Sequence, residues 1–491
     1  MHGRRRSPLI ATLALTALGA LAPAEASTGV SAGAPCIAAL TERCESWAAV
    51  YDGPAGLDDL AEDLAISPDG STLFTGGSRI VGGSPLTGAD SDFGVVANDA
   101  DTGAFLWATG YGGPGSPDGA RDDGVLDLAA SADGSLVYAT GYSRGETGDI
   151  DYDYATIALD AITGTRRWAE RMAGDPGDWD QVSELATGTV TDAEDRSREL
   201  VFVSGYSYTA DGGGHSITVA YEGATGDEVW RAQMEGGPEI RGLAFVPDPR
   251  EDGSVGGRVI VTGRDFRAAA YDAETGDLLW EQEGPDVGDA GYAWDAAASP
   301  DGRHVYATGV AAILDLTLGS SIDGFTVAYD SATGDVAWTA VYRGTGEGDD
   351  VGQAVVADAD RVYVTGYGKG EGPLTEGFVA AYDAGSGATA WQASQQGPGG
   401  GSFTGWAITT SPDGAHVFAS GYAPFTVTDY RAGDGRRLWT ARYTPPATSD
   451  GAYALAVSPD SSRLFAAGAH SAVPVSQQAT GSDFLTAAYE I

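Results

Sequence analysis

The stretch AYDSATGDVAW, residues 328–338, decides the fold. It contains the end of an alternating strand, an acidic turn that closes on Thr333 and Gly334, and a tryptophan four residues after that glycine, Trp338. Closely similar phrases end at six further tryptophans: Trp107, Trp168, Trp230, Trp280, Trp391 and Trp439. Such regular self-similarity indicates a repeat architecture, in which one small unit is copied along the chain.

Two other phrases complete the unit. An apolar segment of the type VYVTG, residues 362–366, precedes each acidic turn, and SPDG turns stand at 67–70, 299–302 and 411–414. Each unit therefore holds four short strands: A before the SPDG turn, B at VYVTG, C leading into the acidic turn, and D with the tryptophan. Asp-Gly and Thr-Gly pairs supply the positive φ angles of tight hairpins, and about 55 residues per unit suits a β-propeller.

The two ends of the repeat region predict how the ring closes. Residues 47–51, WAAVY, form a strand D without its A, B and C, and residues 484–489, FLTAAY, form a strand C without its D. Pairing the two completes one blade and removes two exposed sheet edges. We therefore predict an all-β fold over residues 45–491, an eight-bladed β-propeller of four-stranded blades. Its last blade is closed by the N-terminal strand, three strands plus one.

The strand order defines two faces. The D–A and B–C loops lie on one, the loop face, and the A–B and C–D turns lie on the other, the turn face. Ligands of propellers commonly sit on the loop face near the central channel. On the turn face, residues 192–199 and 248–257 lengthen two A–B hairpins with polar sequence that we expect to be solvated.

The N-terminus reads as an export signal over residues 1–26. Arginines at positions 4–6 precede an apolar run at 9–21, and Ala24 and Ala26 are the small residues of a cleavage site. Residues 27–44 would form an N-terminal segment. Its Cys36 and Cys44, the two cysteines of the chain, would form a disulfide in an oxidising compartment. We expect a secreted, extracellular protein.

The charge excludes several partner classes. The formal net charge is −43, which repels phosphate backbones and anionic lipid surfaces. After residue 21 there is no apolar run long enough for a membrane span. We therefore expect a monomer whose partner is an extracellular ligand or protein, with no nucleic acid and no membrane span.

The phrase A-x-D-x-x-T-G-x-x-x-W resembles the repeat of PQQ-like (quinoprotein dehydrogenase-like) propellers, and the chain is also similar to bacterial secreted beta-propeller repeat proteins. The resemblance implies that the strand D tryptophan of each blade, Trp47 included, docks that blade onto its neighbour. Many alcohol-oxidising members carry two adjacent cysteines beside the quinone, and a C-x-x-C-H motif would bind haem. The sequence has neither. It requires no cofactor, and we do not expect it to bind PQQ.

Carboxylates recur on the predicted loop face. Each lies five residues before an apolar residue of strand A: Asp59, Asp123, Asp180, Asp350 and Asp450. Turned toward one opening, they would attract cations such as calcium. Alternatively, each caps its own loop through backbone N–H groups. A second calcium candidate is Asp149, Asp151 and Asp153, which resembles half of a calcium loop, or consists of ordinary B–C loop acids.

Aromatic and histidine side chains complete the candidates. Tyr142, Tyr206, Tyr367 and Tyr422 follow the strand B glycine toward the loop face, where they either bind sugars or cationic groups or pack between blades. His215 and His470 are expected in B–C loops.

Two functions remain open. The first is a non-catalytic scaffold that binds a ligand or protein on its acidic loop face. The second is a quinoprotein-type oxidoreductase or carbohydrate-active enzyme with its site at the channel mouth. A ring of equivalent residues around the channel would favour the scaffold, and convergent unlike residues would favour the enzyme. Arg241 and Arg264 are further positions that break the repeat.

Overall fold

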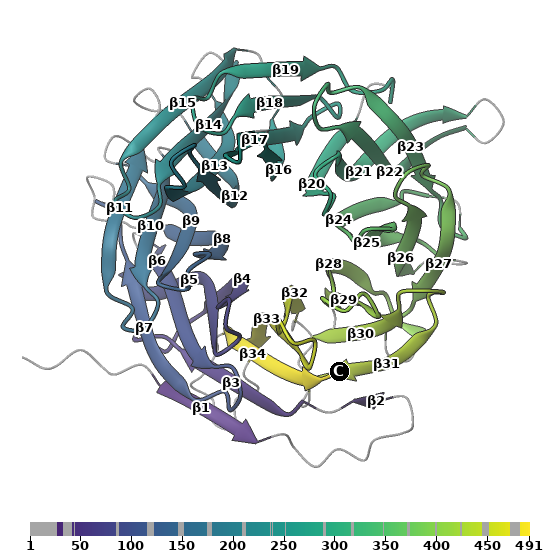
Figure 1. The fold of residues 1–491 in the computed structure, drawn as a ribbon. Coiled ribbons are helices and arrows are strands. Elements are labelled where there is room, and N and C mark those ends of the chain that lie inside the picture. Colours follow the sequence, from purple (N-terminus) through teal and green to yellow (C-terminus); the bar gives the residue numbers. More distant parts are fainter. Residues whose placement is uncertain are drawn as a thin grey trace, which may run out of the picture.

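The computed structural model describes residues 27–32, 42–43, 45–84, 88–114, 122–145, 152–173, 179–208, 213–235, 237, 239–250, 252–287, 291–315, 319–346, 348–370, 374–397, 400–422, 425–443, 451–471 and 482–491. The described chain is an all-β propeller. Its four-stranded blades stand around a central opening, and the first strand of each blade is innermost (Figure 1). Residues 1–26, Cys36 and Cys44 lie outside the described residues, and so do Asp149, Asp151 and Asp450.

The strands fall into four positions from the opening outward. The A strands are β4 (Asp59–Ile66), β8 (Asp123–Ala130), β12 (Trp179–Thr191), β16 (Ile240–Pro249), β20 (Tyr292–Ala298), β24 (Val351–Ala357), β28 (Thr404–Thr410) and β32 (Gly451–Val457). The B strands are β5 (Thr72–Ser84), β9 (Leu136–Arg144), β13 (Ser197–Tyr208), β17 (Val255–Gly263), β21 (His304–Asp315), β25 (Arg361–Lys369), β29 (His416–Tyr422) and β33 (Arg463–Ser471). The C strands are β6 (Gly88–Asp99), β10 (Tyr152–Asp160), β14 (Gly214–Glu222), β18 (Ala268–Asp272), β22 (Gly319–Asp330), β26 (Thr375–Asp383), β30 (Thr426–Arg431) and β34 (Ser482–Glu490). The outer D strands are β7 (Phe105–Tyr111), β11 (Arg166–Met172), β15 (Glu228–Glu235), β19 (Leu278–Gln282), β23 (Val336–Tyr342), β27 (Thr389–Gln395), β31 (Arg437–Arg442) and β3 (Trp47–Asp52).

The repeated tryptophans join neighbouring blades. Trp107 of β7 donates its indole N–H to the carbonyl of Ala161 in the next blade, at 3.1 Å. The same bond recurs at six more: Trp47, Trp168, Trp230, Trp280, Trp338 and Trp391. Trp439 packs between Phe418 and Tyr489, each with its ring centroid 6.0 Å away. The docking role implied by the sequence resemblance is thereby confirmed for these seven tryptophans.

The two ends of the described chain meet in one sheet. β3 pairs antiparallel with β34, from Trp47 opposite Ala488 to Tyr51 opposite Phe484, and β34 pairs in turn with β33. β1 (Ser27–Ala32) lies along the outer edge of β3, and β2 (Glu42–Arg43) pairs with β31.

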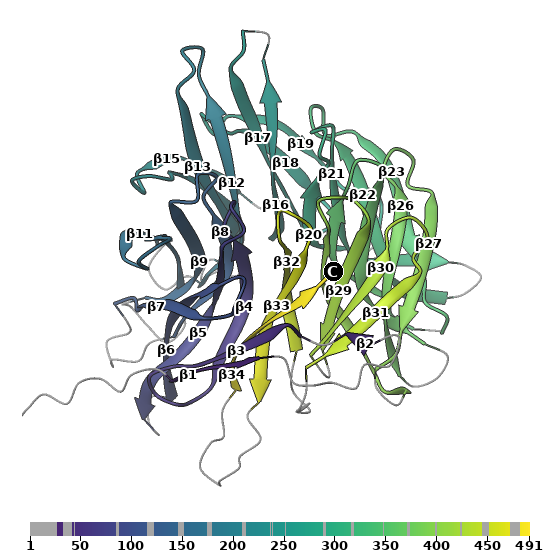
Figure 2. The same cartoon turned by 60° about the horizontal axis from the view of Figure 1, so that its bottom comes forward.

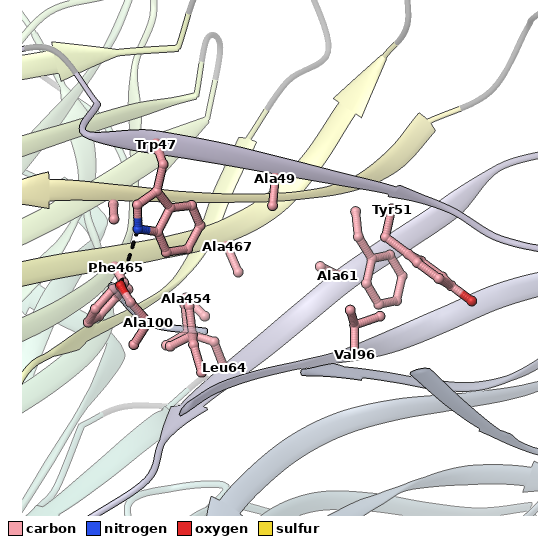
Figure 3. Packing of buried hydrophobic residues seen from close by; sticks show 13 residues of the cluster. Trp47, Ala49, Tyr51, Ala61, Leu64, Val96, Ala100, Ala454, Phe465 and Ala467 are labelled. Carbon is pink, nitrogen blue, oxygen red and sulfur yellow. Dashed lines mark hydrogen bonds between the residues drawn. The ribbon is translucent and has the colours of Figure 1, made fainter. Parts of the chain in front are cut away.

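The core beneath β3 draws on three parts of the chain. Figure 3 shows the Trp47 ring beside Phe465, with its indole N–H directed at the carbonyl of Ala100 at 3.2 Å. Leu64 of β4 lies in the same cluster. β3 therefore links the blade of β32 to β34 with the blade of β4 to β7.

The two lengthened hairpins stand out from the turn face (Figure 2). Their turns, residues 193–197 and 249–253, are exposed where the structure describes them, as the sequence predicted. Thr191 at the end of β12 bridges to Val255 at the start of β17, and the ring of Phe245 stacks on Phe202 at 5.7 Å. The two hairpins thus support each other.

Both candidate histidines lie in strands, which corrects the expectation of B–C loop positions. His215 is in β14 opposite Ser207, and His470 is in β33 opposite Asp483. Strands B and C extend further toward the loop face than the repeat phrases indicated, so that less of each connection is loop. Within the described part of the chain, no helical stretch has the length and apolar character needed to cross a bilayer.

Candidate functional site

The recurring loop-face aspartates hold their own loops. Asp59 is 1% exposed, and its carboxylate accepts N–H groups from Gly53 at 2.5 Å and Ile80 at 2.8 Å. Asp123 accepts from Gly113 and Arg144, and Asp350 accepts from Gly344 and Lys369. Each carboxylate thus ties a D–A loop to the end of strand B in its blade. This is the capping arrangement, with the side chains buried rather than directed as a group into the opening.

A β-bulge in every A strand produces a ring of unlike side chains. One or two residues of each strand lack a partner in the register of strand B. They include Glu62, Leu126, Ser183, Arg241, Trp294, Gln353, Trp406 and Tyr453. Bulges commonly re-aim side chains near functional sites. The A strands are the innermost strands of the blades (Figure 1), so the blades differ in residue type along their inner strands although their cores are alike.

Aromatic rings gather where β10 meets β12. Tyr152, Trp179 and Tyr208 lie side by side because Tyr152 bridges to Trp179 and Trp179 pairs with Tyr208. The ring centroids are 6.3 Å apart for Tyr152 and Trp179, and 5.9 Å apart for Trp179 and Tyr208. Tyr142 extends the row beyond Tyr152 at 5.9 Å, and Tyr206 contacts Tyr208 at 4.7 Å. We call these five residues the aromatic band.

Trp179 is the exposed centre of this band, with 49% of its surface accessible. The other four band residues are half-buried. Two of the sequence candidates, Tyr142 and Tyr206, therefore come together with three residues that the sequence reasoning missed.

Glu239 connects the band to a second aromatic pair. Its carboxylate accepts hydrogen bonds from the Tyr292 hydroxyl and, at 2.8 Å, from Arg241. Burial alone would raise the pKa of Glu239, but these bonds and one from Tyr208 outweigh burial and lower it. Tyr292 stacks on Trp294 at 5.2 Å, and the Arg241 guanidinium lies 5.6 Å from the centre of the Trp294 ring. Glu239 is thus a charged carboxylate fixed by three donors.

Of the remaining candidates, Tyr367, Tyr422 and His470 lie in other blades than the band, while His215 and Asp180 both pair with Ser207 beside it. Tyr367 is half-buried in β25, and Tyr422 is 37% exposed in β29. His470 is buried edge-on against Tyr443, and His215 is half-buried in β14. Asp180 is buried directly after Trp179.

Two acidic groups bear on the calcium hypothesis. Asp153 forms an ion pair with Arg171 at 2.5 Å, so this candidate ligand already faces a cation. Elsewhere, carboxylate oxygens of Asp52, Asp59 and Asp483 lie within 4.8 Å of one another. Burial and the neighbouring carboxylates raise the pKa of Asp483 to about 7. Burial is also the main cause that raises the pKa of Asp59 to about 6.

A further set of acids was missed by the sequence reasoning. Asp63, Asp127, Glu184 and Asp295 each follow the bulge of their A strand. Three of them reach the next blade: Asp63 accepts the N–H of Leu128 at 2.8 Å, Asp127 that of Leu185 at 2.6 Å, and Asp295 that of Val355 at 2.7 Å. These carboxyls connect the inner strands of adjacent blades around the opening.

The environment of these four acids favours the protonated form of their carboxyl groups. Burial raises the pKa of Asp63, Asp127 and Glu184, and the charge of Asp127 raises that of its two neighbours further. The hydrogen bond from the Leu185 N–H and those with Asp63 and Glu184 lower the pKa of Asp127 in part, but burial outweighs them. Burial raises the pKa of Asp295 to about 7.

Lowering the pH from 8 to 5 is therefore expected to stabilise the fold. Between the ordinary value of 3.8 and the folded value of about 7 for Asp295, the folded state binds more protons than the unfolded state, so the free energy of unfolding falls as pH rises. In Asp295→Asn this slope should be shallower. At pH 8 the variant should be more stable by about 1–2 kcal/mol, given about 1.4 kcal/mol per tenfold change in proton affinity and some screening by water. Urea unfolding at several pH values measures both effects.

Asp69→Asn is the matched control. Hydrogen bonds from Ser67 and Ser71 lower the pKa of Asp69 to about 2, so this group is ionised in both states throughout the range. Its replacement should shift the whole stability curve without changing the slope between pH 5 and 8. An equally steep slope in Asp295→Asn and in the unsubstituted protein would contradict the assignment.

The missed residues did leave a signal. Trp179 stands where three other blades carry the first acid of an Asp-Asp pair: Asp58, Asp122 and Asp349. Asp63, Asp127 and Glu184 recur four residues after Asp59, Asp123 and Asp180. Aligning the repeats position by position would have shown both the break and the recurrence.

Comparisons with known proteins place this architecture. A family model described as outer membrane protein assembly factor BamB matches residues 153–419 and 323–487. No curated protein matches the chain. Among solved structures, the computationally designed Ika8 protein is 15% identical with a TM-score of 0.52, covering 88% of this chain and 97% of that one. The Dos1 propeller is 12% identical with a TM-score of 0.51, covering 88% and 92%.

BamB from Moraxella catarrhalis is 16% identical with a TM-score of 0.47, covering 87% of this chain and 96% of that one. At such identities the solved structures show the fold alone. The family model, by contrast, spans more than half of the chain. The chain therefore belongs to the BamB-like family of PQQ-type repeat β-propellers.

Proposed function

We propose that this protein is a secreted, non-catalytic binding propeller that takes an extracellular ligand or protein on its loop face, at the aromatic band. One observation carries the proposal. Trp179 is half exposed on a seam between blades where the corresponding residue is Asp58, Asp122 or Asp349. Exposed aromatic rings of this kind anchor ligands.

The state of the nearby acids supports a binding role. Asp59, Asp123 and Asp350 each accept two backbone N–H groups, and Glu239 is held by three donors with its pKa lowered. A general acid or base needs access to the substrate proton, and Asp59, Asp123 and Asp350 are buried. These carboxylates are arranged to hold loops and tyrosines instead.

A carbohydrate-active enzyme is the second candidate, favoured by one residue of the bulge ring. Burial raises the pKa of Glu62 to about 7, and the Glu62 charge acts on Tyr142 of the band. A carboxyl with this pKa could serve as an acid at neutral pH. The A-strand bulges carry different residues from blade to blade, which also fits the enzyme hypothesis.

In this proposal the propeller has eight blades around one axis, and β3 is the fourth strand of the last blade. The pairing of β3 with β34 supports this closure, and so do the inter-blade indole bonds. We further propose that residues 1–26 are removed on export and that Cys36 and Cys44 form a disulfide in the segment 27–44. The working form would be a monomer without PQQ, and its net charge of −43 disfavours nucleic acid and membrane surfaces.

Binding and catalysis are separated by one set of assays on the full chain. We expect the protein to bind a member of a panel of neutral polysaccharides, proline-rich peptides and quaternary ammonium compounds, and Trp179→Ala to lose that binding. We expect it to release no reducing ends from the polysaccharides, and to reduce no redox dye when given PQQ, calcium and an alcohol. Turnover by the unsubstituted protein that is lost in Glu62→Gln would contradict the binding proposal and support the enzyme hypothesis.

A further inference from the structure

We propose that the aromatic band binds a neutral polysaccharide chain along the row Tyr142, Tyr152, Trp179 and Tyr208. This inference rests on the proposed function and names its ligand class. It follows from the arrangement of the rings, from the polar groups that accompany them, and from the charge of the protein.

The rings form a row rather than a cage. They come from four neighbouring strands, β9, β10, β12 and β13, and successive centroids along the row are 5.9, 6.3 and 5.9 Å apart. A quaternary ammonium group is bound by several ring faces directed at one point. A row spread over two blades instead suits an extended ligand that offers one apolar face after another, as a chain of sugar rings does.

Fixed polar groups accompany the row at both ends. The Tyr152 hydroxyl donates to Asp122 at 2.5 Å, and Asp122 also accepts from Ser91. At the other end, Glu239 is bonded to Tyr208, Tyr292 and Arg241. Each tyrosine hydroxyl that donates to a carboxylate keeps lone pairs that accept from a ligand hydroxyl, and each carboxylate has room for further donors. Rings alternating with held hydroxyls match the apolar faces and hydroxyl edges of a sugar chain.

Charge selects among polysaccharides. The net charge is −43. Asp122 and Glu239 bind tyrosine hydroxyls of the band, and Asp180 directly follows Trp179. A uronic acid or sulfated chain would be repelled. A neutral chain avoids this cost and gains charge-assisted hydrogen bonds.

Two other described seams carry a serine and an aspartate in place of the aromatic residues. Where β6 approaches β8, the residues corresponding to Tyr152 and Trp179 are Ser91 and Asp122, which bridge to each other. Where β34 approaches β4, the Ser482 N–H donates to Asp58 at 2.8 Å. These seams are closed by a serine and an aspartate. The seam of β10 and β12 has exchanged that pair for two aromatic rings, one of them exposed.

The test is affinity electrophoresis of the full chain in native gels, supported by titration calorimetry. The gels contain hydroxyethyl cellulose, arabinoxylan, a β-1,3-glucan, starch, mannan or, as the anionic arm, polygalacturonate. A proline-rich peptide and choline are titrated in parallel. We expect retardation by at least one neutral polysaccharide and none by polygalacturonate. Trp179→Ala should weaken binding about 30-fold, the effect of losing an aromatic anchor.

Trp406→Ala is the matched control, because Trp406 is also an exposed tryptophan, at 40%, and has one aromatic neighbour, Tyr453 at 5.8 Å. It should bind as the unsubstituted protein does. Equal binding by Trp179→Ala, or loss with Trp406→Ala alone, overturns the inference. Binding of the peptide or choline in place of sugars, lost with Trp179→Ala, overturns the ligand class and keeps the proposed function. Binding to none of the probes counts against both.

Discussion

Trp47→Ala is expected to lower the free energy of unfolding by about 3–5 kcal/mol, the usual cost of removing a buried tryptophan. The side chain is 3% exposed, packs on Phe465 and donates to the carbonyl of Ala100. Its strand β3 pairs with β34 near the end of the chain. Loss of this one ring therefore weakens the contact between the first and last parts of the propeller. Urea unfolding followed by circular dichroism measures the change.

Ala48→Gly in the same strand is the control that distinguishes loss of the Trp47 ring from a general weakening of β3. It weakens β3 without removing the Trp47 contacts and should cost only about 1 kcal/mol. If Trp47→Ala were no more destabilising than this control, the indole would not be what holds the ends together.

Gly164→Ala is expected to lower the free energy of unfolding by about 3 kcal/mol or more. Gly164 lies in the C–D turn with φ at +66°, and an added Cβ would stand 2.5 Å from Cε3 of Trp107 and 2.7 Å from the Thr109 hydroxyl. The left-handed backbone alone costs alanine about 1–2 kcal/mol. Overlap with the docking tryptophan adds the cost of moving a packed ring by more than 1 Å, which tight packing makes about 1–3 kcal/mol.

Gly414→Ala isolates the backbone part of this cost. Gly414 has a φ of +70°, and nothing lies within 4 Å of the added Cβ. It should lose only about 1–2 kcal/mol. Thermal melts of both variants give the comparison, and equal losses would mean that the inter-blade fit of tryptophan on glycine adds nothing.

Local patterns made the propeller readable from sequence. Trp338 and its counterparts follow the glycine of an acidic turn by a fixed interval, so the same docking interaction is encoded in each repeat. The lone strands at 47–51 and 484–489 predicted the β3–β34 pairing. The sequence also pointed to Asp59, Asp123 and Asp350. A carboxylate beside a loop, however, is equally consistent with cation binding and with capping of backbone N–H groups. The burial of these carboxylates, and their N–H donors on two different connections, distinguish the two only in three dimensions.

The aromatic band could not be assembled from the sequence. Tyr152 and Trp179 belong to different blades, and they touch because β10 bridges to β12 at this seam. Glu239 gathers Tyr208, Arg241 and Tyr292 from three blades. Which residues of neighbouring blades meet depends on the curvature of the propeller. The position of Trp179 within its own repeat was the one local clue, because it breaks an otherwise acidic pattern.

Oxidative footprinting read by mass spectrometry tests most directly whether the seam of β10 and β12 is the binding site. The full chain is exposed to hydroxyl radicals with and without the neutral polysaccharide that binds it. We expect Trp179 and Tyr208 to become protected while Trp406 and Tyr422 stay as reactive as before. Protection of Trp406 and Tyr422 with Trp179 unchanged would contradict this expectation.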